Sequence, residues 1–355
     1  MVPQFRWWAG VCSEFPGQLS SIHQSSAFPD VTAWRRLALQ ADRQGKPIVF
    51  RQQLHQDETN GNITSPVFLP ALRKWFGPTV PGKPTELSPS LARHLSHIVP
   101  YELAPSSADP LRKHALQHFL EWLRCSRDAA YKKLSTPLMD CILAAKLEQQ
   151  AHVPAGQGSR GALDTPFIRF DAPLALLAAA LHYNRETPDP SERVDQLYIA
   201  QMPLSELPGA LQLDVPIPNA LTADPTPEIP YTADIYISSL WLGLEPTFTP
   251  WHRDPNPNLF CQLVGSKTVR LMPPAPGKQL FAQVSAGLGQ LNASHAIRGQ
   301  EMMQPTERKA WWDAVWGPSV PKGMFEVVLR PRDVLFLPMG WWHSVRSILL
   351  RMDSL

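Results

Sequence analysis

The stretch Thr249–Pro274 reads TPWHRDPNPNLFCQLVGSKTVRLMPP, and it holds the residues that decide the fold class. Near its start, His252 and Asp254 stand two positions apart. In an extended strand residues i and i+2 point to the same face, so one imidazole and one carboxylate can reach the same metal ion. Near its end, Lys267–Met272 (KTVRLM) follows a glycine and a serine and predicts a second strand. The stretch therefore predicts a pair of metal ligands on an extended segment, followed by strands at Asn258–Val264 and Lys267–Met272.

A second histidine must come from elsewhere in the chain to complete such a site. His343 lies in Pro338–Arg346 (PMGWWHSVR), directly after the predicted strand Asp333–Leu337. Two histidines and one carboxylate leave positions on the metal open, which is typical of non-haem Fe(II) oxygenases. A pair such as His252 and Asp254 also recurs by chance, so the residues around it must decide the interpretation.

These surrounding residues resemble the core motif of the JmjC family, in the cupin-like branch that contains the asparaginyl hydroxylase acting on hypoxia-inducible factor. That motif runs T-P-x-H-x-D, N-x-F-x-Q, G-x-K and then a strand ending in P-P. The chain has every element in order: Thr249, Pro250, His252, Asp254, Asn258, Phe260, Gln262, Gly265, Lys267, Pro273 and Pro274. The segment 340–345 (GWWHSV) resembles the family's segment with the second histidine. The resemblance covers residues 195–347 well and the N-terminal half only loosely.

The resemblance implies two cofactors and a residue for each contact. Fe(II) would bind His252, Asp254 and His343. 2-Oxoglutarate would chelate the metal, and its far carboxylate needs a cation and hydroxyl donors, because a buried unpaired carboxylate is costly. By resemblance Lys267 is that cation, and Thr249 and Tyr198 are the hydroxyl donors.

Asn258 is expected to help bind the cosubstrate or a water molecule. Without the resemblance, a solvated strand lysine, a packing tyrosine and a turn asparagine are the alternative interpretations of Lys267, Tyr198 and Asn258.

The two halves of the chain differ in sequence pattern, with mostly helix-like segments in the first and strand-like segments in the second. This predicts a mixed, mostly helical N-terminal region (1–185) and a cupin-like catalytic domain (186–355). In the first, helices are predicted at Val31–Arg43, Asp109–Cys125, Pro137–Gln150 and Pro173–Leu181, a strand at Pro47–Arg51 and a Gly-rich loop at His152–Thr165. In the second, strands are predicted at Gln196–Gln201, Asp234–Leu242, Asn258–Val264, Lys267–Met272, Phe325–Leu329 and Asp333–Leu337, with a helical insert at Met302–Trp316.

Many short strands separated by Gly, Pro and Asn are typical of a sandwich or a barrel. Together with the resemblance, this predicts a mainly β fold: a double-stranded β-helix, or jelly-roll cupin barrel, with a mostly helical N-terminal extension. The family resembled has a further strand after the distal histidine, whereas only SVRSILLRMDSL follows His343. We therefore expect that this C-terminal strand is missing and that a sheet edge beside the site is left open.

Composition narrows the function classes further. The chain has 355 residues, 44% of them hydrophobic, which is enough for a large buried core. Its net charge of +2 argues against a dedicated nucleic-acid surface. No run approaches the ~20 apolar residues of a membrane span. The N-terminus lacks a secretory signal pattern, so a cytoplasmic or nuclear location is expected.

The resemblance implies a 2-oxoglutarate-dependent oxygenase that hydroxylates a protein or peptide side chain, yielding succinate and CO₂. Alternatives among JmjC relatives are a histone lysine demethylase and a tRNA-base hydroxylase, and a small-molecule tailoring oxygenase is another. A catalytically inactive cupin-like binding protein is the alternative outside enzymes. The branch also suggests a homodimer.

Overall fold

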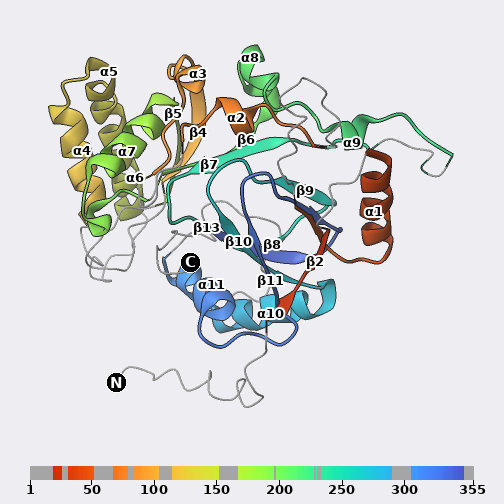
Figure 1. Cartoon of the computed structure of the whole chain (residues 1–355). Coiled ribbons are helices and arrows are strands. Elements are labelled where there is room, and N and C mark those ends of the chain that lie inside the picture. Colours follow the sequence, from red (N-terminus) through yellow and green to blue (C-terminus); the bar gives the residue numbers. More distant parts are fainter. Residues whose placement is uncertain are drawn as a thin grey trace, which may run out of the picture.

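The computed structural model describes residues 19–25, 31–51, 67–78, 84–103, 114–151, 167–195, 197–227, 229, 233–289 and 305–347. Their strands form three sheets (Figure 1). The five-stranded sheet has the order β1 (Ser20–Ser21), β11 (Phe325–Leu329), β10 (Lys267–Met272), β13 (Trp342–Ser347) and β8 (Phe248–Arg253). The second has the order β2 (His23–Ser25), β3 (Ile48–Phe50), β12 (Val334–Leu337) and β9 (Asn258–Cys261). The third has the order β5 (Ile168–Pro173), β4 (Ile98–Leu103), β6 (Leu197–Pro203) and β7 (Ser239–Gly243).

The first two sheets enclose one apolar core. Val269 and Leu271 of β10 and Val345 of β13 pack in a single buried cluster with Val49 of β3 and Leu335 of β12. These residues alternate with outward-facing ones along their strands, as two packed sheets require. This is the arrangement expected of the predicted jelly-roll barrel, and β10 and β11 have the predicted bounds.

Helices from the N-terminal half pack on the third sheet. They are α4 (Ala115–Cys125), α5 (Ala129–Lys132), α6 (Ser135–Ala151) and α7 (Ala175–Glu186), which gather on one side of the molecule in Figure 1. Phe119 and Leu123 of α4 share a buried cluster with Tyr101 of β4 and Ile199 of β6. The predicted helices at 31–43, 109–125, 137–150 and 173–181 correspond to α1 (Val31–Arg43), α4, α6 and α7.

The N-terminal half also supplies strands that the sequence did not predict. β4 and β5 lie before residue 185 and β6 lies after it, yet β4 pairs with both β5 and β6. β3 likewise pairs with β12 of the barrel. β1 pairs with β11 in the five-stranded sheet, so the two regions share all three sheets. The Gly-rich segment 152–165 and the C-terminal segment 348–355 lie outside the described residues.

Two helices are inserted between β10 and β11, where only one was predicted. α10 (Pro274–Gly287) and α11 (Pro305–Trp316) lie beneath the five-stranded sheet in Figure 1. Phe281 of α10 and Trp311 of α11 pack with Trp342 of β13. The insert therefore covers the face of that sheet opposite the barrel core. The remaining short elements are α2 (Ala71–Lys74), α3 (Pro89–Ala92), η3 (Pro190–Glu192), η4 (Leu204–Glu206), α8 (Gly209–Gln212) and α9 (Asn219–Thr222).

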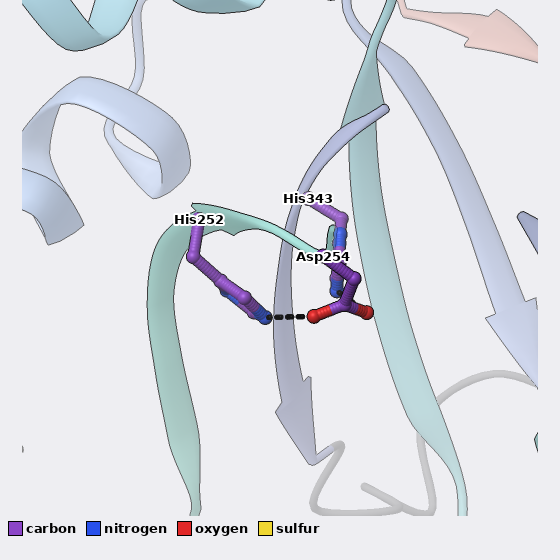
Figure 2. Close-up of side chains that lie close together, drawn as sticks. All are labelled: His252, Asp254 and His343. Carbon is purple, nitrogen blue, oxygen red and sulfur yellow. Dashed lines mark ion pairs between the residues drawn. The ribbon is translucent and has the colours of Figure 1, made fainter. Parts of the chain in front are cut away.

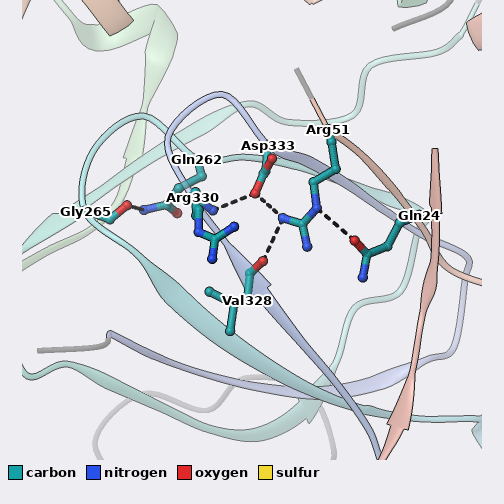
Figure 3. Close-up of polar contacts among 7 residues, drawn as sticks. All are labelled: Gln24, Arg51, Gln262, Gly265, Val328, Arg330 and Asp333. Atoms are coloured by element: carbon teal, nitrogen blue, oxygen red, sulfur yellow. Dashed lines mark hydrogen bonds and ion pairs between the residues drawn. The ribbon is translucent and has the colours of Figure 1, made fainter. Parts of the chain in front are cut away.

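A polar cluster ties β3 to the turn between β11 and β12 (Figure 3). The Arg51 guanidinium contacts the Asp333 carboxylate and donates to the Val328 carbonyl at 2.8 Å. The Asp333 carboxylate also accepts from the Arg330 backbone N–H at 2.7 Å. Because Asp333 is buried, this cluster fixes the turn against the N-terminal strand.

Among the described residues, no helix is both long enough and apolar enough to cross a bilayer.

Candidate metal centre

Strands β8 and β13 bring the three predicted metal ligands together. They pair antiparallel with His252 directly opposite His343, and Asp254 follows the end of β8. His252 Nε2 lies 4.0 Å from Asp254 Oδ1, and His343 Nε2 lies 3.7 Å from Asp254 Oδ2. One ligand atom from each residue lies within 4.8 Å of the other two. Figure 2 shows the two imidazoles pointing toward the carboxylate.

Both imidazoles have the tautomer and charge that a metal requires. His252 Nδ1 lies 2.8 Å from the Pro250 carbonyl, and His343 Nδ1 lies 3.4 Å from the Trp341 carbonyl. Because a carbonyl only accepts, each Nδ1 carries the proton and leaves the Nε2 lone pair free. Burial lowers the pKa of both histidines, which keeps the rings neutral. The donor set therefore fits a divalent transition-metal ion.

Asn258 occupies a position that refines its predicted role. Its amide Nδ2, at the start of β9, donates to Asp254 Oδ2 at 2.8 Å. A hydrogen bond to a ligating carboxylate fixes the orientation of that carboxylate. The structure thus places Asn258 against the candidate metal ligand itself.

Lys267 and Tyr198 come together from different sheets. Lys267 Nζ, at the start of β10, lies 3.5 Å from Tyr198 Oη on β6, and it also faces the Phe260 ring at 5.4 Å from its centre. Burial lowers the pKa of Lys267 to about 8, and nearby Glu245 opposes that shift. Burial raises the pKa of Tyr198, so its phenol stays protonated and able to donate. A cation and a phenol in a partly dry site can hold a carboxylate.

Thr249 and His252 share a face because of an irregularity in the sheet. Residues three apart in a regular strand point to opposite faces. The register between β8 and β13 shifts between His343 and Val345, so that Thr249 pairs with Val345 while His252 pairs with His343. Val345 pairs in turn with Val269, two residues from Lys267 on β10. Thr249 and Lys267 therefore lie on the same face, separated by one strand.

Sequence reasoning missed two residues of this pocket. Gly243 of β7 pairs with Tyr198, and a Cβ at this position would overlap the tyrosine ring. Gly243 directly follows the predicted strand Asp234–Leu242, and this position gave only a weak signal of the close approach. Glu245 gave no such signal. It reaches the surface beside Gly265, and partial burial raises its pKa to about 7, while Lys267 opposes the shift.

Comparisons with known proteins agree with this geometry. The cupin-like domain family matches residues 158–353, more than half of the chain. Jumonji C domain-containing protein 5 of Drosophila melanogaster is 35% identical over 153 residues, which cover 42% of this chain and 33% of that protein. Lysine-specific demethylase 8 of Danio rerio is 33% identical over 152 residues, again 42% of this chain and 33% of the relative.

A more distant relative, tRNA wybutosine-synthesizing protein 4 of Neurospora crassa, is 28% identical over 158 residues, or 43% of this chain and 12% of that protein. The chain thus spans a third or less of the length of these relatives. The predicted mainly β cupin fold is confirmed, whereas the assignment to the asparaginyl-hydroxylase branch stays a prediction. The chain belongs to the cupin-like family of JmjC-domain proteins.

Proposed function

We propose that this chain is an Fe(II)- and 2-oxoglutarate-dependent oxygenase. The observation that carries the proposal is the pair of neutral imidazoles whose free Nε2 atoms meet one carboxylate. In this proposal His252, Asp254 and His343 would hold Fe(II), the ion that this donor set suits and that would react with cosubstrate and O₂. Asn258 keeps the Asp254 carboxylate in place.

The second part of the proposal concerns 2-oxoglutarate. Lys267 and Tyr198 would hold its far carboxylate, with Thr249 as a third donor on the same face. The bound metal and cosubstrate supply oxidative decarboxylation and the oxidation of a C–H bond. The residues of the chain orient both groups, and apolar side chains such as Phe260 exclude water from the pocket.

One experiment separates an oxygenase from an inactive binding protein. The purified chain is mixed anaerobically with Fe(II) and 2-oxoglutarate, and the metal-to-ligand charge-transfer band is recorded. Oxygen is then admitted and succinate is measured. We expect a band and succinate from the natural chain, no band from His252→Ala, and a band only at much higher 2-oxoglutarate from Lys267→Ala. A folded natural chain with neither band nor succinate overturns the proposal.

For the substrate, we propose a protein or peptide side chain, which is hydroxylated. The relatives named lysine-specific demethylases favour demethylation as a second candidate with the same site. Mass spectrometry of peptide libraries distinguishes the two, because hydroxylation adds one oxygen atom whereas demethylation removes a methylene unit and releases formaldehyde. Turnover of a small molecule or a tRNA alone would overturn the proposed substrate class. We further propose that residues 186–355 carry the catalytic groups, that the chain forms a homodimer and that it is cytoplasmic or nuclear.

A further inference from the structure

The outer side of β13 is tied to the inserted helix α11 directly behind a metal ligand. Ser344, next to His343, is fully buried. Its hydroxyl donates to the Thr249 carbonyl on β8 at 2.6 Å and accepts from the Trp316 indole N–H at 2.9 Å. One side chain therefore connects the last residue of α11 to both strands that carry the candidate metal site.

This connection lies where the sheet is irregular. The register of β8 against β13 shifts between His343 and Val345, and Ser344 is the residue between them. The shift is what allows Thr249 and His252 to face the same pocket. At such a shift, two paired strands form fewer regular backbone hydrogen bonds with each other. A side-chain hydrogen bond between the strands therefore contributes more to holding their register.

Trp316 is held firmly enough to act as a fixed donor. The guanidinium of Arg270 lies 4.7 Å from its ring centre and that of Arg346 lies 4.4 Å from it. Arg270 also donates to the Val315 carbonyl and forms an ion pair with Glu326 at 2.7 Å. Two cations stacked on one indole restrain its tilt, and the hydrogen bond to Ser344 then fixes its direction.

We infer that Ser344 and Trp316 are positioning residues for the metal centre. They set the shifted register that aligns His343 with His252 and brings Thr249 into the same pocket. α11 supplies no ligand, yet it would control the geometry of the third ligand from the far side of the sheet. This inference rests on the proposed function, because it assumes that the three ligands hold a metal.

The test uses Co(II), whose d–d absorption reports both affinity and coordination geometry. The variants are Ser344→Ala, which removes the hydroxyl, and Trp316→Phe, which keeps an aromatic ring next to Arg270 and Arg346 and removes the N–H. We expect each to weaken Co(II) binding by about 10-fold or more and to alter the d–d band. Ser344→Thr keeps the hydroxyl and is expected to retain most of the affinity.

Trp75→Phe is the matched control, because Trp75 is also a buried indole whose N–H donates, to Asp214 at 3.0 Å, in another core cluster. It should lower the melting temperature without changing Co(II) affinity or the band. The inference is wrong if Ser344→Ala and Trp316→Phe bind Co(II) as the natural chain does. It is also wrong if, at equal loss of stability, they change the Co(II) affinity and the d–d band no more than Trp75→Phe does. Failure of the natural chain to bind Co(II) would instead contradict the proposed function.

Discussion

At the scale of single residues, Asn258 separates two interpretations of the site. Its hydrogen bond to Asp254 predicts that Asn258→Ala weakens metal binding about 10- to 100-fold, because the carboxylate loses its orienting partner. A role in binding cosubstrate or water, as the sequence suggested, predicts instead an unchanged metal affinity and a raised KM for 2-oxoglutarate. Titration with Co(II) in the absence of cosubstrate decides between them.

Gly243 permits the close approach of Tyr198. In Gly243→Ala the new methyl group overlaps the tyrosine ring, so we expect a loss of about 1–3 kcal/mol in the free energy of unfolding and weaker 2-oxoglutarate binding. Thermal unfolding and cosubstrate titration measure the two effects. Gly209→Ala is the control, since open space surrounds that glycine. Equal stability of the two variants would show that the Tyr198 ring can move without cost.

The pair Lys267 and Glu245 predicts a pH dependence of cosubstrate binding. Lys267, with a pKa lowered to about 8, loses its charge as the pH rises through that value, and a neutral amine no longer attracts the carboxylate. Glu245, with a pKa raised to about 7, gains a negative charge above that value and repels it. Both effects weaken binding in the same direction.

We therefore expect the dissociation constant of 2-oxoglutarate to increase from about pH 6.5 to about pH 9, instead of staying level up to the ordinary lysine pKa of about 10.4. Glu245→Gln should flatten the lower part of this curve and leave the upper part in place. A constant affinity across the range, measured by anaerobic titration of the charge-transfer band, would contradict the prediction.

At the scale of elements, the Arg51–Asp333 contact predicts the stability of the β11–β12 turn. Arg51→Ala leaves the buried Asp333 carboxylate without its cation, and we expect a loss of about 2–3 kcal/mol, less than for a fully buried pair because Arg51 is partly exposed. Arg124→Ala removes the ion pair with Glu121 and should cost much less, because solvent screens that exposed pair. Denaturant unfolding that ranks the two variants equally would contradict this.

The elements also show what sequence could and could not predict. β10 and β11 were predictable to the residue, because each is a β-branched run bounded by turn residues. β4 was missed, since Pro100 interrupts its pattern and its pairing with β5 and β6 is long-range. α10 was not predicted; it begins with prolines and contains Gly277, and both residue types are unfavourable inside helices. The structure shows why the glycine is there: a Cβ at Gly277 would overlap Trp342.

In the candidate site too, residues in local motifs could be predicted from sequence, whereas residues that depend on long-range contacts could not. His252, Asp254 and Lys267 could be predicted because they stand in one local motif, and His343 because its flanking residues resemble a second one. Other residues contact partners on segments that are distant in sequence, and no local sequence pattern predicts such contacts. These residues are Gly243, Glu245 and Ser344. The register shift that aligns Thr249 with His252 is likewise a property of two strands together.

At the scale of the whole molecule, the shared sheets predict that the β-rich part cannot fold without the first half. A fragment of residues 186–355 would lose β1 from the five-stranded sheet, β2 and β3 from the second sheet, and β4 and β5 from the third. It would also expose Leu197 and Ile199 of β6, which are buried in the cluster with α4 and α7. An open sheet edge with exposed apolar side chains favours aggregation.

We therefore expect the fragment to be aggregated or to lack a cooperative thermal transition, while the whole chain has one. Circular dichroism and gel filtration of both make the comparison, and Co(II) absorption reports whether the metal centre forms in each. A monomeric fragment that unfolds cooperatively and binds Co(II) as tightly as the whole chain would show that the boundary near residue 185 separates two independent domains. If the fragment instead fails to fold as we expect, the change of sequence pattern near residue 185 is a change of composition within one folding unit. The helices of the first half then support the structure of the site in the second half.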